Sequence, residues 1–339
     1  MQYLPLKSVL LTGAAGYVGS TLSRRLLADG CQVVGLDNYA RGHADALPSG
    51  MSMIRGDIRD PDAIRQALQL FARPPQACIH LASYILVGES VHEPQLYHDI
   101  NSIGTQVVAE VCLDAGVSAL TLASSAAVLS AQQHGADRLD EDAFIGPESP
   151  YGESKVAGER TLAALAQTGK MSAVALRLFN VAGAAYGMAE RHDPETHLIP
   201  LALRAAVGEL PRLKVFGAGL GTPDGSCLRD YVHMHDVLEA FVRATARSVA
   251  LQLAGDASYD VFHVGSGVGR SVLEVISVCE QVLGRSVPWQ QQPPRAGDVP
   301  ILVADPTRLM RELQFTPDAD LPRMVRDCAL ALGMTVADV

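Results

Sequence analysis

The chain has 339 residues, 48% hydrophobic and 19% charged, with a formal net charge of −10 and no basic run, which excludes a disordered protein and argues against nucleic-acid binding. The length allows two lobes, and six scattered cysteines indicate buried free thiols. Because no apolar stretch reaches the length of a membrane span and the start lacks a signal-peptide pattern, we expect a cytoplasmic enzyme.

The first predicted strand, residues 8–12, leads into a glycine-rich turn and then a helix from Ser20 to Ala28. This order of elements brings backbone amides and a helix N-terminus to a pyrophosphate. Gly13 permits the tight turn, Gly16 lets the backbone approach the phosphates, and Gly19 lets the helix pack closely on the strand. The turn therefore predicts a dinucleotide site.

The second predicted strand, residues 31–36, ends in Asp37. An acid about 20 residues after the glycine turn can bind a ribose 2′-hydroxyl and repels a 2′-phosphate, which favours NAD over NADP. Arg41 is a counter-argument because it could bind that phosphate, but Asp37 followed by Asn38 is the stronger sign.

Two further strands are predicted at residues 53–58 and 77–82. In the first, Asp57 could face the adenine ring, cap the helix that begins near Asp60, or do both. His80 lies inside the second strand, and we interpret it as a structural core histidine.

A long helix is predicted over residues 95–115, in which Asn101 is either a ligand or a solvent-facing residue. The fifth strand, residues 119–123, delivers Ser124 and Ser125 to its end, where they are either functional or part of a turn.

The next helix, residues 151–166, places Tyr151 and Lys155 on one face because they are four residues apart. An ammonium beside a phenol favours the phenolate and prepares it for proton transfer, although a solvated helix face is the simpler alternative. With a sixth strand at 172–180, strands and helices alternate across residues 8–180. This alternation predicts an α/β fold with a doubly wound parallel sheet.

The composition changes at residues 181–231, which are rich in glycine, proline and isolated charges and are expected to form functional loops. Residues 232–264 read as a helix and a strand that rejoins the sheet. We therefore expect a nucleotide-binding domain over 1–180, completed by 232–264, and a smaller mixed α/β substrate lobe within 181–339.

Taken together, these motifs resemble the extended short-chain dehydrogenase/reductase family, and most closely its UDP-glucose 4-epimerase branch. The matching segments follow the family's order and spacing along almost the whole chain. They are residues 12–20, 36–38, 56–58, 87–90, 124–126, 149–155, 177–180, 192–200, 229–233 and 295–298.

The resemblance implies NAD-dependent 4-epimerisation of a UDP-sugar, most naturally UDP-glucose and UDP-galactose, through a transient 4-keto sugar. Tyr151 would be the base, Ser125 would hydrogen-bond the same sugar oxygen, and Lys155 would bind the nicotinamide ribose and lower the pKa of Tyr151. No metal is expected, and family members are usually homodimers joined through two helices, here 95–115 and 151–166.

The resemblance also implies two sets of binding residues. For NAD they are Gly13, Gly16, Tyr17, Val18, Gly19, Asp37, Asn38, Asp57, Ile58, Asn101, Ser124, Tyr151, Lys155 and Phe179. For the UDP-sugar they are Ser125, Tyr151, Asn180, His197, Leu198, Lys214, Phe216, Arg229, Tyr231, Arg295, Asp298 and Leu302. Arginines suit a diphosphate because guanidinium pairs bidentately with phosphate oxygens, although two surface arginines are the alternative.

Several residues depart from the family pattern and affect the choice of sugar. Ala127 replaces a threonine, Ile85 a lysine and Leu178 a tyrosine. Leu302 stands where a large aromatic residue is thought to exclude 2-acetamido sugars, so UDP-GlcNAc or a UDP-pentose are alternative substrates.

Three other functions are alternatives to UDP-sugar 4-epimerisation. A 4,6-dehydratase needs an Asp-Glu pair where this chain has Ala126 and Ala127. A net NAD-dependent oxidoreductase would need exchangeable cofactor, and a silent NAD-binding scaffold would have no reason to retain Ser125, Tyr151 and Lys155 together.

Overall fold

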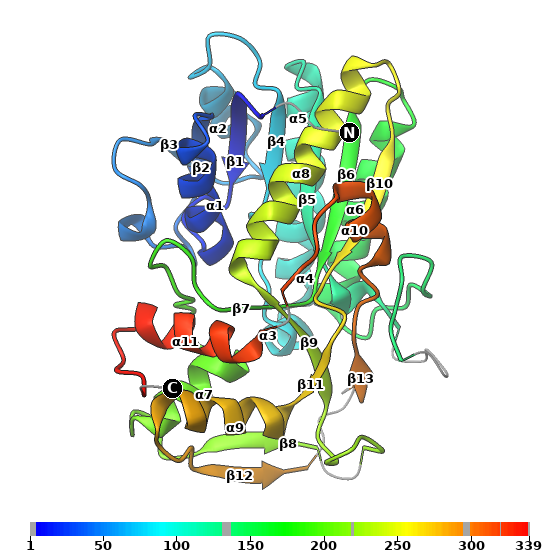
Figure 1. Cartoon of the computed structure of the whole chain (residues 1–339). Coiled ribbons are helices and arrows are strands. Elements are labelled where there is room, and N and C mark those ends of the chain that lie inside the picture. Colours follow the sequence, from blue (N-terminus) through cyan, green and yellow to red (C-terminus); the bar gives the residue numbers. More distant parts are fainter. Residues whose placement is uncertain (1–4, 131–136, 218–219, 294–298, 319, 338–339) are drawn as a thin grey trace. The chain divides into compact units, whose positions relative to one another are not determined.

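A computed structural model describes residues 5–130, 137–217, 220–293, 299–318 and 320–337 (Figure 1). Two compact units make up the chain. The first comprises Met1–Leu129, Ile145–Arg177 and Leu238–Phe262, and the second Ser130–Phe144, Leu178–Val237 and His263–Val339.

The first unit is built on a seven-stranded sheet with the order β10-β6-β5-β4-β1-β2-β3. Neighbouring strands from β5 to β3 are parallel, and β1 lies between β2 and β4. The strands are β1 (Ser8–Thr12), β2 (Gln32–Asp37), β3 (Ser52–Arg55), β4 (Ala77–His80), β5 (Ala119–Ser125), β6 (Ser172–Leu178) and β10 (Tyr259–Val264). This order confirms the predicted doubly wound fold, including the strand near residue 260 that rejoins the sheet.

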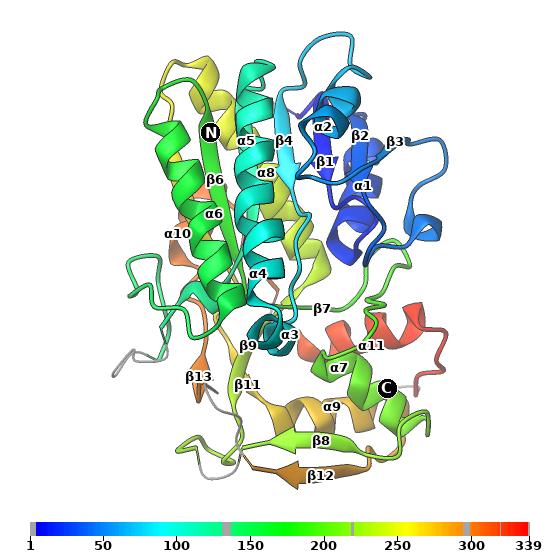
Figure 2. The same ribbon diagram turned by 180° about the vertical axis from the view of Figure 1, so that it is seen from behind.

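Helices cover both faces of this sheet (Figures 1 and 2). On one face lie α1 (Tyr17–Ala28) and α8 (Met234–Leu253), joined by an ion pair of 2.9 Å between Arg25 and Glu239. On the other face lie α2 (Pro61–Leu68), α5 (Gly104–Asp114) and α6 (Pro150–Ala166), as Figure 2 shows. Leu10, Ile64, Val108, Leu120 and Leu162 are fully buried in the core between these helices and the sheet.

The long helix predicted over residues 95–115 is confirmed in extent, but a π-helical turn interrupts its α-helical hydrogen bonding. After α3 (Val87–His92), the chain forms α4 (Pro94–Tyr97), a π-helical turn (His98–Ile103) and only then α5. The wider turn carries Asn101, which is 2% exposed and therefore does not face solvent. Its side chain accepts a hydrogen bond from the Tyr84 amide at 2.8 Å and donates to the Tyr84 carbonyl at 2.9 Å, so it braces the loop after β4.

His80 is a core residue, as predicted, and its neutral tautomer follows from its hydrogen bonds. The Thr105 hydroxyl donates to the Asn101 carbonyl at 2.6 Å, so at 3.0 Å it accepts from His80 Nε2. The Nδ1 atom then accepts from the Thr12 hydroxyl at 2.6 Å. Burial lowers the pKa of His80 to about 3, and the charge of Lys155 adds to this effect.

This shift predicts a pH-dependent stability. The unfolded chain binds the His80 proton near pH 6.5 and the folded chain only near pH 3, so stability falls as pH falls through that window. Between pH 7 and pH 5 the loss from His80 should be about 2 kcal/mol. Urea unfolding of the wild type, His80→Gln and the exposed control His98→Gln measures it. Equal pH dependence in wild type and His80→Gln would contradict the assignment.

The second unit holds most of the elements that were not predicted from the sequence, although the helix expected over residues 271–283 is present as α9 (Val272–Leu283). It contains a four-stranded sheet of β7 (Asn180–Ala182), β9 (Leu228–His233), β11 (Gly269–Ser271) and β13 (Ile301–Leu302), and a parallel pair of β8 (Leu213–Phe216) and β12 (Trp289–Gln292). Its helices are α7 (Leu198–Ala206), α9 (Val272–Leu283), α10 (Thr307–Leu313) and α11 (Leu321–Ala331).

Two expectations for this part are corrected. Residues 181–231 are not only loops, because they contain α7 and β8. The helix expected from Val232 begins at Met234, because Val232 and His233 belong to β9 and pair with β7. All six cysteines are free and buried, as expected. Within the described ranges, no helix has both the length and the apolar character needed to cross a membrane.

Candidate active site

The glycine turn between β1 and α1 has the shape of a phosphate cradle. Gly13 has a φ of +69°, and a Cβ there would lie 2.5 Å from the Ala82 nitrogen. A Cβ on Gly19 would lie 2.1 Å from the Gly13 carbonyl oxygen, so the helix can approach the strand only without a side chain. Gly16 has no neighbour closer than 3.4 Å and leaves its position open. These three positions fit a dinucleotide pyrophosphate at the N-terminus of α1.

Asp37 lies at the end of β2, next to this turn. Its carboxylate accepts hydrogen bonds from the Ala15 amide at 2.9 Å and from the Tyr39 amide at 2.7 Å. The side chain is only 8% exposed, and each of its oxygens binds a backbone amide, so Asp37 holds the turn in place. A carboxylate oxygen has further lone pairs, so Asp37 can still accept from a ribose hydroxyl.

The contacts of the neighbouring charges exclude the helix-capping role of Asp57 and engage Arg41, while the adenine contact of Asp57 stays a prediction. Asp57 does not cap the next helix, because Asp60 accepts the Asp62 amide at 2.9 Å. Instead, hydrogen bonds from Arg59 lower the pKa of Asp57 to about 2. Arg41 forms an ion pair with Glu89 at 2.5 Å, so its guanidinium is already engaged by an acid.

Ser125, Tyr151 and Lys155 come together at the carboxyl end of the sheet. Ser125 is the last residue of β5, and Tyr151 lies in the first turn of α6, which Ser149 caps by accepting the Gly152 amide at 3.2 Å. The Lys155 ammonium lies 5.8 Å from the centre of the Tyr151 ring and donates to the Ala123 carbonyl at 2.9 Å.

The pKa of Tyr151 departs from the sequence expectation. Burial raises it, and a side-chain hydrogen bond with Ser125 lowers it only in part. The Lys155 ammonium lies over the ring and donates to a backbone carbonyl, so it does not offset the effect of burial. Burial lowers the pKa of Lys155 itself to about 7, while the charge of Glu159 opposes that shift. The protein's own groups therefore keep the phenol protonated, and the positive ring of an oxidised nicotinamide is the charge that would favour the phenolate.

A buried ion pair between Glu159 and Arg177 lies next to the group of Ser125, Tyr151 and Lys155. Glu159 is one helical turn after Lys155, and its carboxylate receives Arg177 Nε at 2.9 Å and Nη2 at 2.8 Å. The Ser124 hydroxyl donates to the same carboxylate at 2.5 Å. Glu159 and Arg177 are 7% and 5% exposed. Sequence reasoning missed Glu159, although its i+4 spacing from Lys155 was the available signal.

Some of the residues predicted to bind the cofactor have structural contacts. Ile58 is in the core of the first unit, and Asn101 braces Tyr84 and the Ser154 hydroxyl. Tyr17 and Val18 begin α1 directly after the turn. Phe179 belongs to the second unit, where its ring lies 5.5 Å from that of His263. Their cofactor contacts remain predictions.

In the second unit, β9 presents Arg229 and Tyr231 on one face and Asp230 on the other, because side chains alternate along a strand. Asp230 is fully buried and accepts four hydrogen bonds, from Ser266 N and Oγ, Gly267 N and Ala304 N, so it anchors the strand. Tyr231 has a side-chain hydrogen bond with Asn180, and burial raises its pKa.

Leu302 pairs with Arg229 in the sheet, as does Arg270 from the other side. Directly paired residues share a face, so the three side chains lie in a row. Arg270 forms an ion pair with Glu274 at 2.7 Å. Sequence reasoning placed Leu302 and Arg229 in one site but missed Arg270, which only the strand pairing brings beside them.

The other predicted substrate residues also lie in the second unit. His197 precedes α7 and Leu198 begins it, while Lys214 and Phe216 are on β8. Arg295 and Asp298 lie outside the described residues.

Comparison with known proteins shows extensive similarity. Residues 9–259 match the model of the NAD dependent epimerase/dehydratase family. A UDP-glucose 4-epimerase of Halalkalibacterium halodurans is 37% identical over 312 residues, which cover 91% of this chain and 90% of the relative. A crystal structure of UDP-glucose 4-epimerase from Brucella ovis in complex with NAD has a TM-score of 0.89 and 35% identity, covering 98% of this chain and 100% of the other. One from Stenotrophomonas maltophila, with bound NAD and formylated UDP-arabinopyranose, has a TM-score of 0.87 and 34% identity, covering 95% and 96%.

Proposed function

The chain belongs to the NAD dependent epimerase/dehydratase family, and on that premise we propose that it is an enzyme that interconverts two UDP-sugars epimeric at C4, with NAD as cofactor. UDP-glucose and UDP-galactose are the proposed pair. The observation that carries the proposal is the hydrogen-bonded Ser125 and Tyr151 with Lys155 at the carboxyl end of the sheet that also bears the glycine turn.

The proposed mechanism assigns one task to each side chain. Tyr151 removes the proton of the sugar 4-hydroxyl and later returns it, while Ser125 hydrogen-bonds the same oxygen. When bound, NAD would supply the acceptor and later the donor of the hydride at the sugar C4. Lys155 would hold the nicotinamide ribose, and the turn from Gly13 to Gly19 would hold the pyrophosphate. In the second unit, Arg229 binds the diphosphate, so affinity comes from groups remote from the reacting carbon.

Of the three alternative functions, two are disfavoured by the residues of this chain and one is left to experiment. Dehydration needs an acid and base after the serine pair, where Ala126 and Ala127 form a short 3₁₀ turn that Ser125 caps. A silent scaffold has no use for the retained Ser125, Tyr151 and Lys155. A net oxidoreductase would produce lasting NADH, which the following experiment detects.

The proposal is tested on the purified full chain. Bound NAD is measured after denaturation, and a panel of UDP-sugars is assayed without added cofactor. We expect near-stoichiometric NAD, conversion of UDP-galactose to UDP-glucose, and no net rise in absorbance at the NADH maximum. Protein that carries NAD yet epimerises none of the sugars would overturn the proposal.

The size of the residue at Leu302 is proposed to decide whether 2-acetamido sugars enter. Leucine is smaller than tyrosine, and its partner in the sheet is Arg229, the proposed diphosphate ligand. We expect the wild type to epimerise UDP-GlcNAc as well as UDP-glucose, and Leu302→Tyr to lower UDP-GlcNAc turnover by roughly tenfold or more while preserving UDP-glucose turnover. Ile301→Tyr, on the opposite face of β13, is the control. No detectable UDP-GlcNAc turnover by the wild type would contradict this prediction.

We also propose a homodimer that is joined through the faces of α5 and α6, which lie side by side on the sheet (Figure 2). Ile103, at the start of this face, is 40% exposed, and Val87 and Val91 of α3 are 49% and 60% exposed. Burial of such apolar side chains would favour association. Light scattering at micromolar concentration tests the dimer. The cytoplasmic location stays a prediction.

A further inference from the structure

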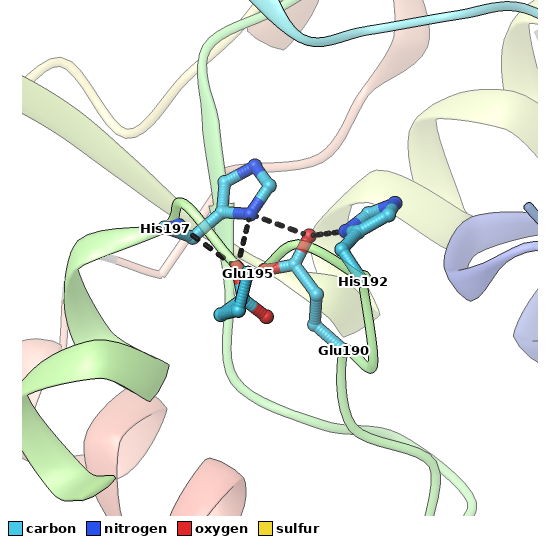
Figure 3. Close-up of side chains that lie close together, drawn as sticks. All are labelled: Glu190, His192, Glu195 and His197. Carbon is cyan, nitrogen blue, oxygen red and sulfur yellow. Dashed lines mark hydrogen bonds and ion pairs between the residues drawn. The ribbon is translucent and has the colours of Figure 1, made fainter. Parts of the chain in front are cut away.

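Four side chains with metal-binding atoms converge in the loop between β7 and α7 of the second unit (Figure 3). They are Glu190, His192, Glu195 and His197, spaced within eight residues of the chain. One ligand atom from each lies within 4.8 Å of all the others. Figure 3 shows both carboxylates and both Nδ1 atoms directed toward one another.

The contacts are short and centre on Glu190. Its Oε1 lies 2.7 Å from His192 Nδ1 and 3.0 Å from His197 Nδ1. Glu195 Oε1 lies 2.8 Å from the same His197 nitrogen. Glu190 is 7% exposed, so its carboxylate is removed from water. A buried carboxylate beside a second carboxylate requires a compensating cation.

Hydrogen bonds do not account for this arrangement. His192 Nδ1 is buried and makes no hydrogen bond, although it is the atom closest to Glu190. His197 Nδ1 carries at most one hydrogen, which a 2.8 Å hydrogen bond to Glu195 Oε1 would use, yet the same nitrogen also lies 3.0 Å from Glu190 Oε1. Glu195 Oε1 accepts the Thr196 and His197 amides at 2.8 Å each, which fixes its direction. His192 Nδ1 and Glu190 Oε1 therefore face each other without a hydrogen bond between them.

The two carboxylates favour a positive charge at this point, because the side chains of Glu190 and Glu195 are both almost completely withdrawn from water. Burial raises the pKa of the nearby Cys328 to about 12, and the same two carboxylates add to this. The thiol thus stays neutral, and the donors are two imidazole nitrogens and two carboxylate oxygens.

We propose that Glu190, His192, Glu195 and His197 form a binding site for one divalent transition-metal ion of the zinc class. Imidazole and carboxylate donors in a group of four suit Zn²⁺, whereas Mg²⁺ and Ca²⁺ prefer oxygen ligands alone. In a tetrahedral site with bonds near 2.1 Å, donor atoms are roughly 3.4 Å apart. No metal is expected from the sequence, and the spacing of these four residues matches none of the familiar zinc patterns.

The ion would have a structural task. It ties the loop after β7 to His197, the residue directly before α7. It takes part in no step of the proposed epimerisation, so the two proposals can fail separately.

The test measures metal content rather than turnover. The purified full chain with its cofactor is dialysed against a chelator and then titrated with ZnCl₂, with MgCl₂ as a second titrant. We expect one zinc per chain by plasma mass spectrometry, and a higher melting temperature with ZnCl₂ but not with MgCl₂. CoCl₂ should give visible absorption typical of four-coordinate cobalt.

Glu190→Gln and His192→Asn should each weaken zinc binding roughly a hundredfold or more, because they remove ligands rather than their supports. His98→Asn is the matched control, since His98 lies 3.4 Å from Asp99 in an exposed pair elsewhere. Equal zinc binding by the wild type, His192→Asn and the control would overturn the proposal. So would a wild type with neither zinc nor a cobalt band, which would leave only a histidine–carboxylate network. If Glu190→Gln does not fold, His192→Asn and the cobalt spectrum still decide whether the four residues bind a metal ion.

Discussion

Tyr151→Phe should lower epimerase turnover by roughly 10³-fold while leaving NAD bound, because it removes one oxygen atom and with it the proposed acid and base. The Tyr151 ring is 7% exposed and lies 6.2 Å, edge to face, from the Tyr97 ring, so a phenylalanine keeps its packing. Turnover of UDP-galactose and the NAD content of the same sample are measured together.

Tyr259→Phe is the control for this result. Its hydroxyl is buried and makes no hydrogen bond, so the same atom is deleted from the same unit outside the catalytic group. We expect turnover close to the wild type. If Tyr151→Phe kept full turnover, the proton would move through another group. If both variants lost turnover equally, the effect would be one of folding.

Glu159→Gln should reduce the free energy of unfolding by about 3–5 kcal/mol, because it leaves the buried Arg177 without its counter-charge. The double variant Glu159→Gln with Arg177→Met removes both charges and should lose less than the sum of the single variants. Urea unfolding measures all three. Asp29→Asn, which breaks an ion pair with the half-exposed Arg25, should cost less than about 1 kcal/mol. If Glu159→Gln also lowered the free energy of unfolding by less than about 1 kcal/mol, the buried ion pair of Glu159 and Arg177 would be contradicted.

The same variant should alter the pH profile of turnover, which a purely structural role would not do. Glu159 raises the pKa of Lys155 against the effect of burial, so its removal lowers that pKa further below about 7. The ammonium of Lys155 is then lost at a lower pH, and the alkaline limb of kcat should move to lower pH. Ser124 also loses the carboxylate that accepts its hydroxyl proton. An unchanged limb would mean that Glu159 acts on stability alone.

Local patterns in the sequence determined the first unit and the residues of its catalytic group. Short apolar runs followed by helices predicted the parallel sheet, and the glycine spacing predicted the turn that Gly13 and Gly19 form. The spacing of Tyr151 and Lys155 predicted their shared helix face. These predictions succeed because the strand period, the helix period and the backbone freedom of glycine act over a few residues.

Only the tertiary structure decided what depends on residues far apart in the chain. Leu302 and Arg270 lie beside Arg229 because three separate strands pair there, and strand pairing leaves no local pattern in so short a segment as β13. The pKa of Tyr151 was expected to be lowered by Lys155, yet burial raises it, and burial is set by the whole fold. The pairing of Glu159 with Arg177 has the same origin, since a helix and a strand must pack before the two charges can meet.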